Sequence, residues 1–192
     1  IQDGRVREVF VTLKGDRLAE VLDEPSTPRM EERLAGLGVT LPEGFKGEMS
    51  LAMEDWIDQI AETLSQGFVI TIDYGQLAQN LYSEQHSQGT LVCYNKHVAS
   101  TDPYQFIGEQ DITAEVDFTS LMRLGERHGL ATVGYSLQRH FLANLGFSSF
   151  IDALQTQNLS QARMELRLMT MKALVDPDQL GDFKVLVQAK GM

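Results

Sequence analysis

The sequence predicts an α/β fold built as a three-layer sandwich of helices and a sheet. Helix and strand patterns alternate along the chain, which is the best single-sequence indication of this class. Residues 67–75, Gly-Phe-Val-Ile-Thr-Ile-Asp-Tyr-Gly, form an apolar, β-branched run bounded by glycines, as in strands covered on both faces in parallel sheets. A hydrophobic content of 43% over 192 residues suits one compact domain, residues 1–192, with a substantial core.

A β-hairpin is expected near the start, within residues 1–24. Residues 5–13 alternate between polar and apolar side chains as a strand does, residues 14–17 have the composition of a tight turn, and residues 18–22 return. The chain begins with Ile and enters this strand pattern almost at once. We therefore expect that it is cut from a longer chain.

A loop and a helix are expected between this hairpin and the apolar strand. Residues 25–48 contain three prolines and several glycines, which predicts a loop around one short helical turn. The helix is predicted from apolar residues that recur at three- and four-residue spacing: Met49, Met53, Trp56, Ile57, Ile60 and Leu64.

The apolar strand ends at a polar, turn-prone tip, Asp73, Tyr74 and Gly75. In open α/β sheets ligands bind beyond the carboxyl ends of the strands, so these three residues are candidates for a binding site. The alternative is structural: Asp73 caps the following turn while Tyr74 fills the core.

Residues 76–112 are the least regular part of the sequence and are expected to form a long covering loop, as in lids and binding loops. His97 lies within it, with Asp102 and Asp111 downstream. An imidazole near a carboxylate can act as a base or position another group. The alternative for His97 is a solvated or hydrogen-bonded structural residue.

The rest of the chain again alternates helices and strands. Asp117 is expected to cap a helix that ends at His128-Gly129, while Glu115 faces water. Methionines and leucines in the last predicted helix are expected to form core. The further predicted elements are a strand at residues 130–135, helices at 139–145, 150–154 and 161–175, and a final strand at 183–189.

Composition excludes several classes of function. Sixteen basic and 27 acidic side chains give a net charge of −11, which argues against nucleic acid or an anionic membrane as the main partner. The single cysteine, Cys93, excludes an internal disulfide and fits a reducing compartment. No apolar stretch approaches the roughly 18 residues of a membrane span, and no signal peptide is evident.

Common catalytic motifs do not occur in this chain. There is no Gly-x-Gly-x-x-Gly after a strand, no phosphate-binding loop ending in Gly-Lys-Ser/Thr, and no Gly-x-Ser-x-Gly elbow. The histidines and the cysteine do not have metal-ligand spacing, so no metal site is expected.

Four blocks of sequence, in this order and spacing, resemble the MidA-like methyltransferase family. The resemblance runs from about residue 5 to residue 190 and implies a class I, Rossmann-like fold, S-adenosyl-L-methionine as cofactor, and a protein arginine as substrate. Mitochondrial members are complex I assembly factors that symmetrically dimethylate an arginine of a complex I subunit. The blocks are residues 67–75, Gly89-Thr90-Leu91-Val92-Cys93-Tyr94-x-x-His97, Gly108-Glu109-x-Asp111-Ile112-Thr113-x-x-Val116-Asp117-Phe118, and Gln138-x-x-Phe141-Leu142-x-x-Leu145-Gly146; Glu48 and residues 181–185 also match.

The family's glycine-rich cofactor loop and its acidic motif after the fourth strand have no counterpart here. The chain therefore resembles the C-terminal half, which would supply the fifth strand and the final antiparallel pair of the sheet, and it is not expected to be active alone. By the same resemblance, Asp73, Tyr74 and Gly75 are expected to bind the cofactor, while His97 and Asp111 are the candidate catalytic residues.

Two hypotheses of different class remain. The chain is either the substrate-side half of a protein arginine methyltransferase or a non-catalytic binding module that keeps the fold and docks a respiratory-complex partner. A sheet cut beside its central strands exposes an unpaired edge, so self-association is also expected. The resemblance implies the cytoplasm for a bacterial source and the mitochondrial matrix for a eukaryotic one.

Overall fold

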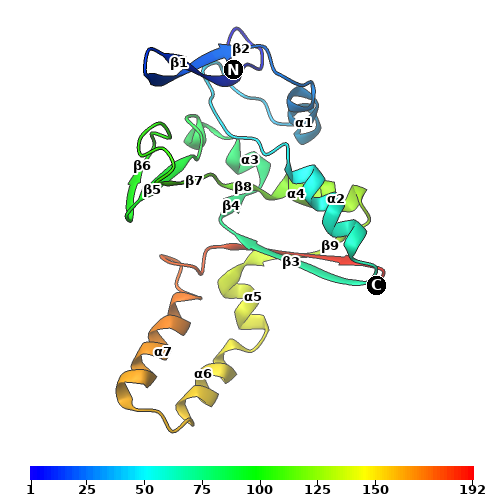
Figure 1. Cartoon of the computed structure of the whole chain (residues 1–192). Helices are drawn as coiled ribbons and strands as arrows, with labels where there is room; N and C mark the ends of the chain where they lie inside the picture. Colours follow the sequence, from blue (N-terminus) through cyan, green and yellow to red (C-terminus); the bar gives the residue numbers. More distant parts are fainter. The chain divides into compact units, whose positions relative to one another are not determined.

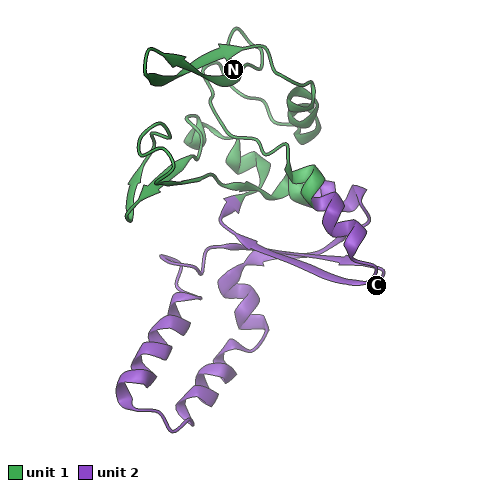
Figure 2. Cartoon of the chain, in the orientation of Figure 1, with its two compact units in different colours: residues 1–56, 76–121 green, residues 57–75, 122–192 purple.

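The computed structural model describes residues 1–192, and the chain divides into two compact units. Unit 1 comprises residues 1–56 and 76–121, and unit 2 comprises residues 57–75 and 122–192 (Figure 2). None of the helices combines the length and the apolar character needed to cross a membrane.

Unit 1 begins with the hairpin of β1 (Glu8–Lys14) and β2 (Arg17–Asp23), followed by helix α1 (Arg29–Leu37) (Figure 1). The hairpin lies within the region where alternation predicts it. Helix α1 is nine residues long, more than the single short turn that the prolines and glycines suggest, because it buries its last residue in a cluster. That cluster consists of Leu37, Phe45, Ala78, Leu81 and Tyr82.

The segment expected to be a long loop contains regular structure. Strands β5 (Val92–Asn95), β6 (Val98–Ser100) and β7 (Asp111–Thr113) form an antiparallel sheet in the order β6-β5-β7. These strands are three or four residues long, too short for their alternation to stand out in the sequence. The other short elements are β4 (Gly75–Gln76), α3 (Ala78–Leu81), the 3-10 turn η1 (Glu84–His86) and β8 (Val116–Asp117).

Unit 2 is built on a sheet with the order β3-β10-β9, in which β10 runs antiparallel to both neighbours. The strands are β3 (Gly67–Asp73), β9 (Ala131–Leu137) and β10 (Lys184–Lys190). The expectation that β3 is covered on both faces is wrong for this chain. Its alternate residues Phe68, Ile70 and Ile72 are 55%, 53% and 47% exposed, because no residue of the chain covers that face.

Helices α2 (Met53–Thr63) and α4 (Phe118–Arg127) occupy the predicted positions. Within unit 2, α4 packs closely on β10: the Gln188 side chain lies against Gly125 and donates to the carbonyls of Leu130 and Met122. Nearby, Nδ1 of His128 lies 2.8 Å from a carboxylate oxygen of Asp58. The C-terminal end of α4 is thus tied to both the sheet and α2.

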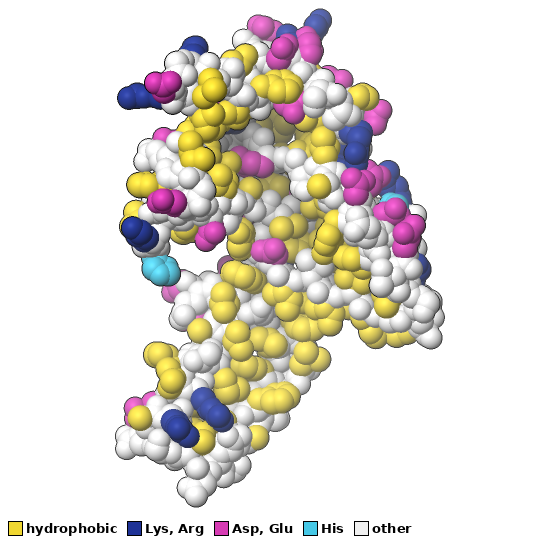
Figure 3. All heavy atoms as spheres, viewed as in Figure 1, with side chains coloured by type: hydrophobic (Ala, Val, Ile, Leu, Met, Phe, Trp, Pro, Cys, Tyr) yellow, Lys and Arg dark blue, Asp and Glu magenta, His cyan; other side chains and the backbone are white.

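Three helices separate β9 from β10: α5 (Gln138–Asn144), α6 (Phe147–Gln155) and α7 (Gln161–Ala173). Helix α7 has no buried residue, and its Leu166 and Met169 are 59% and 66% exposed. The expectation that its methionines and leucines form core is therefore wrong, because α7 packs against α6 and leaves much of its apolar surface uncovered. Figure 3 shows hydrophobic side chains gathered on the visible face of this helical part.

Candidate functional site

A cavity of about 330 Å³ lies within unit 1. Its walls come from α1, from the segment that leads into α2, from the residue after α3, and from the stretch around β8 and the start of α4. The polar lining residues are Arg33, Glu48, Ser50, Tyr82, Glu115, Asp117 and Ser120, and the other lining residues are Met49, Met53, Ala114 and Val116. Three of these side chains are carboxylates and one is a guanidinium, so the cavity is predominantly acidic.

Thr90 links the carboxylate of Glu48 to the backbone of Glu115. The backbone N–H of Thr90 donates to Oε2 of Glu48 at 2.8 Å, and the Thr90 hydroxyl donates to the same oxygen at 3.2 Å. The Thr90 hydroxyl oxygen accepts the backbone N–H of Glu115 at 3.0 Å. Gly89 allows the approach of Glu48, because a Cβ at this position would stand 3.0 Å from the Glu48 carboxyl carbon.

The carboxylates of Glu115 and Asp117 differ in their hydrogen bonding. Oε2 of Glu115 is buried and has no hydrogen-bond partner, so the expectation that Glu115 faces water is wrong. Asp117 accepts the backbone N–H of Ser120 at 3.1 Å and the Ser120 hydroxyl at 2.6 Å, which confirms its predicted capping of α4. Its position as the helix cap also fixes it in the cavity wall.

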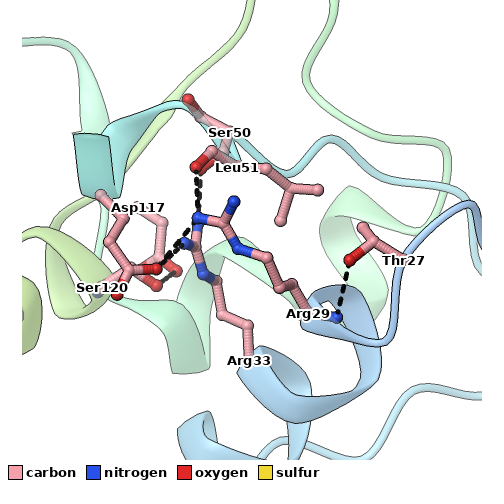
Figure 4. Close-up of polar contacts among 8 residues, drawn as sticks. Thr27, Arg29, Arg33, Ser50, Leu51, Asp117 and Ser120 are labelled. Atoms are coloured by element: carbon pink, nitrogen blue, oxygen red, sulfur yellow. Dashed lines mark hydrogen bonds and ion pairs between the residues drawn. The ribbon is translucent and has the colours of Figure 1, made fainter. Parts of the chain in front are cut away.

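The cation in the cavity wall is already engaged. Arg33 donates to the carbonyl of Ser50 and lies 3.8 Å from Glu54, while Arg29 donates to Glu54 at 3.0 Å and to the carbonyl of Leu51 at 3.2 Å (Figure 4). Burial lowers the pKa of the Arg33 guanidinium, and the charge of Glu54 opposes that shift. These bonds hold α1 to the segment that precedes α2.

Tyr82 is one of the buried polar side chains of the cavity wall. It is 7% exposed, and its ring centroid lies 6.4 Å from that of Phe45. Burial raises the pKa of the Tyr82 hydroxyl, and the charge of Asp117 adds to this.

A larger cavity of about 580 Å³ adjoins the first within unit 1 and shares Glu48, Met49 and Tyr82 with it. Its lining includes apolar residues of the hairpin and of α1, among them Val9, Leu22 and Leu34. Nowhere in the structure do three or more His, Cys, Asp or Glu side chains gather as they would around a metal ion.

The residues predicted for cofactor binding form a tip at the end of β3 in unit 2. Asp73 accepts the backbone N–H of Tyr74 at 2.8 Å through Oδ1, which leaves Oδ2 able to accept from a ligand. Tyr74 is 39% exposed and meets Phe183 edge-on, with ring centroids 5.8 Å apart, while Gly75 is buried. This tip therefore presents an acceptor and an exposed aromatic ring, and its role in cofactor binding stays a prediction.

The two predicted catalytic residues lie in unit 1 on the β6-β5-β7 sheet. His97 and Lys96 form the tight turn between β5 and β6, with φ angles of 66° and 49°. Asp111 pairs with Tyr94 across the β5-β7 ladder. Both side chains are exposed, neither makes a hydrogen bond, and neither lines the acidic cavity.

Sequence reasoning did not single out Arg33 or Tyr82, and it gave Glu48 no chemical role. One signal was available: the acids Asp111, Glu115 and Asp117 stand close together in the sequence. Of these, Glu115 and Asp117 line the cavity and Asp111 does not.

Comparison with known proteins identifies the family. Residues 1–136 match the model of a family described as "Putative S-adenosyl-L-methionine-dependent methyltransferase". The chain belongs to this methyltransferase family. No curated protein matches the chain.

Two crystal structures from Burkholderia thailandensis resemble this methyltransferase-family chain over 99% of its length, each at 29% sequence identity. The first is a native structure of an uncharacterised protein, with a TM-score of 0.86, and the second is bound to S-adenosyl-homocysteine, with a TM-score of 0.85. The chain covers 50% and 49% of these two proteins, so it spans about half of their length. S-adenosylmethionine is the cofactor of the family, and S-adenosyl-homocysteine is the product that remains after it gives up its methyl group.

Proposed function

We propose that the chain is the substrate-side half of an S-adenosylmethionine-dependent protein arginine methyltransferase. The observation that carries this proposal is the similarity to a protein bound to S-adenosyl-homocysteine, which extends over 99% of this chain but only 49% of that protein. Membership of the methyltransferase family over residues 1–136 supports the same reaction class.

The sheet of unit 2 supports the proposed position of this half in a class I fold. The order β3-β10-β9, with β10 antiparallel to both neighbours, has the arrangement expected of the fifth strand and the final antiparallel pair. The uncovered face and edge of β3 would then adjoin the half that carries the glycine-rich cofactor loop. The tip of Asp73, Tyr74 and Gly75 would lie at the cofactor end of that sheet.

The proposed reaction transfers a methyl group from the cofactor's sulfonium to a guanidinium nitrogen. A nitrogen–carbon bond forms as the sulfur–carbon bond breaks, the sulfonium becomes a neutral thioether, and the nitrogen gives up one proton. His97 and Asp111 are the proposed groups for orienting the nitrogen and accepting that proton. The net charge of −11 is compatible with a cationic substrate.

The substrate protein that we propose is a subunit of respiratory complex I, on the resemblance to the MidA-like family. The proposed location follows from the source: the cytoplasm in a bacterium, or the mitochondrial matrix in a eukaryote. The buried, unpaired Cys93 is compatible with either reducing compartment.

A calorimetric titration of S-adenosylmethionine into this chain tests the division of the enzyme into halves. The chain lacks the glycine-rich loop, so no saturable binding is expected. Saturable one-to-one binding would overturn the proposal that the cofactor site needs the other half.

Asp111→Asn in the complete enzyme tests the catalytic role of Asp111. Methylation should fall while cofactor affinity stays nearly unchanged, and unchanged turnover would exclude that role.

The alternative function, a non-catalytic module that docks a protein partner, is favoured by one observation: no glycine-rich loop occurs in the 192 residues. The coding sequence immediately upstream separates the two proposals. A glycine-rich loop there supports the enzyme, whereas a start codon at the boundary supports the docking module.

A further inference from the structure

The acidic cavity of unit 1 has more negative charge than its own cation balances. Glu48, Glu115 and Asp117 line it, against a single guanidinium, Arg33. Arg33 is bound to the Ser50 carbonyl and faces Glu54, which does not line the cavity. Charged groups withdrawn from water are unfavourable unless they are paired, so the cavity is suited to an incoming cation.

One buried polar atom in the cavity wall lacks a hydrogen-bond partner, which indicates a ligand. Oε2 of Glu115 is buried without a hydrogen bond. Tyr82 is 7% exposed, and the charges that act on its hydroxyl are those of Asp117, Arg33 and Glu48, which line the same cavity. A buried acceptor without a partner costs about 1–3 kcal/mol, so a ligand that donates to Oε2 of Glu115 would be bound in preference to an empty cavity.

We propose that this cavity is the subsite that holds the guanidinium of the substrate arginine. The assignment rests on the proposed arginine methyltransferase function for its biological meaning, but the chemistry comes from the cavity. Neither His97 nor Asp111 lines this cavity, so the assignment replaces them as the groups that orient the guanidinium. Glu115 accepts one edge of the guanidinium through its free oxygen, and Glu48 accepts from another nitrogen. The Tyr82 hydroxyl accepts a third N–H, while Asp117, held by Ser120, adds charge without being displaced from its helix cap.

The arrangement of the three acids favours a guanidinium over an ammonium. Thr90 stands between Glu48 and Glu115, donating to the side chain of the first and accepting from the backbone of the second. Glu48, Glu115 and Asp117 do not gather around one point as they would around a metal ion. A planar guanidinium carries five N–H donors that can reach separated acceptors, whereas an ammonium concentrates its charge and three donors at one atom.

The adjoining larger cavity gives room for the polypeptide that carries the arginine. It meets the acidic cavity at Glu48, Met49 and Tyr82, and apolar side chains of the hairpin and of α1 line much of it. An arginine side chain entering from there would pass its apolar stem along Met49 before its charged head reaches the carboxylates.

The test uses calorimetric titration of the chain with N-acetyl-arginine N-methylamide, and with the corresponding lysine compound. The arginine probe should bind saturably and the lysine probe at least several-fold more weakly. Glu115→Gln should weaken arginine binding by about tenfold or more, since a charge-assisted hydrogen bond is worth about 1.5–3 kcal/mol. Tyr82→Phe should weaken it less.

The matched control is Glu109→Gln, which removes one acidic charge from an exposed residue outside the cavity. It should leave the affinity unchanged. No binding by the unaltered chain, equal binding of both probes, or an equal loss in Glu109→Gln would overturn the assignment. Circular dichroism of each variant confirms folding. The titration contains no cofactor, so it tests arginine binding separately from methyl transfer. If the chain binds the arginine probe but the complete enzyme transfers no methyl group, the proposed function is refuted and this subsite stands.

Discussion

Gly89 illustrates how a single residue fixes the acidic cavity. Its φ angle is +81°, and a side chain there would press on the carboxylate of Glu48. Glu48 is held by two hydrogen bonds from the next residue, Thr90. The glycine is therefore needed both for its backbone conformation and for the close approach of a charged group.

We predict that Gly89→Ala destabilises the chain more than Gly108→Ala does. Both positions have a φ near +80°, so both variants carry a backbone strain of about 1–2 kcal/mol, but a Cβ at Gly108 meets nothing within 4 Å. Gly89→Ala should cost about 1.5–3 kcal/mol more, because Glu48 loses its bonds to Thr90. Urea unfolding followed by the fluorescence of Trp56 measures the difference. Equal losses in the two variants would contradict the role assigned to Gly89.

The raised pKa of the Tyr82 hydroxyl predicts that the stability of the chain depends on pH. Its pKa is raised above the ordinary value of 10.0, mainly by burial, so the folded chain keeps the neutral phenol at a pH where the unfolded chain ionises. The contribution of the neutral Tyr82 phenol to the free energy of unfolding is complete below about pH 10 and is lost as the pH rises above it. The free energy of unfolding should fall less steeply between about pH 9 and pH 11 in Tyr82→Phe. Identical slopes for the variant and the unaltered chain would contradict this.

At the scale of elements, the contact between α4 and β10 depends on a small residue in the helix. Gln188 is fully buried, and a Cβ at Gly125 would stand 2.8 Å from its amide carbon. Glycine normally weakens a helix interior by about 1 kcal/mol relative to alanine. Here it permits the helix to approach the sheet.

We therefore predict opposite effects for two glycine-to-alanine changes in helices. Gly36→Ala in α1 should stabilise the chain by about 0.5–1 kcal/mol, because its Cβ meets nothing within 4 Å. Gly125→Ala should destabilise it by about 1–3 kcal/mol through overpacking against Gln188. Urea unfolding followed by circular dichroism distinguishes them, and stabilisation by both changes would refute the packing argument.

Sequence patterns located the long elements because their periodicity extends over several turns or residues. Helix α4, with its Asp117 cap and its end before Gly129, and strand β10 lie where the patterns predict them. The sheet of β5, β6 and β7 was missed because three- and four-residue strands carry little alternation. The cavity was missed because Arg33, Tyr82 and Glu115 are far apart in sequence, and no local pattern indicates that they converge.

At the scale of the whole molecule, exposed apolar surface predicts self-association of the isolated chain. Phe68, Ile70 and Ile72 lie on one uncovered face of β3, and β3 has no strand beyond its free edge. Light scattering should show a mass above that of the monomer, increasing with concentration. Ile70→Lys should reduce association, whereas Val98→Lys, on the exposed strand β6, should not. A strictly monomeric chain at high concentration would contradict this prediction.

The measurement that tests the central claim most directly is methyl transfer by the complete enzyme, in which the chain is joined to the upstream half that we propose. Radiolabelled S-adenosylmethionine is supplied with an arginine-containing peptide and with the same peptide carrying lysine instead. The account predicts label in the arginine peptide alone, and a large loss of label with Glu115→Gln but not with Glu109→Gln. No label in either peptide, or equal label in both, would contradict it.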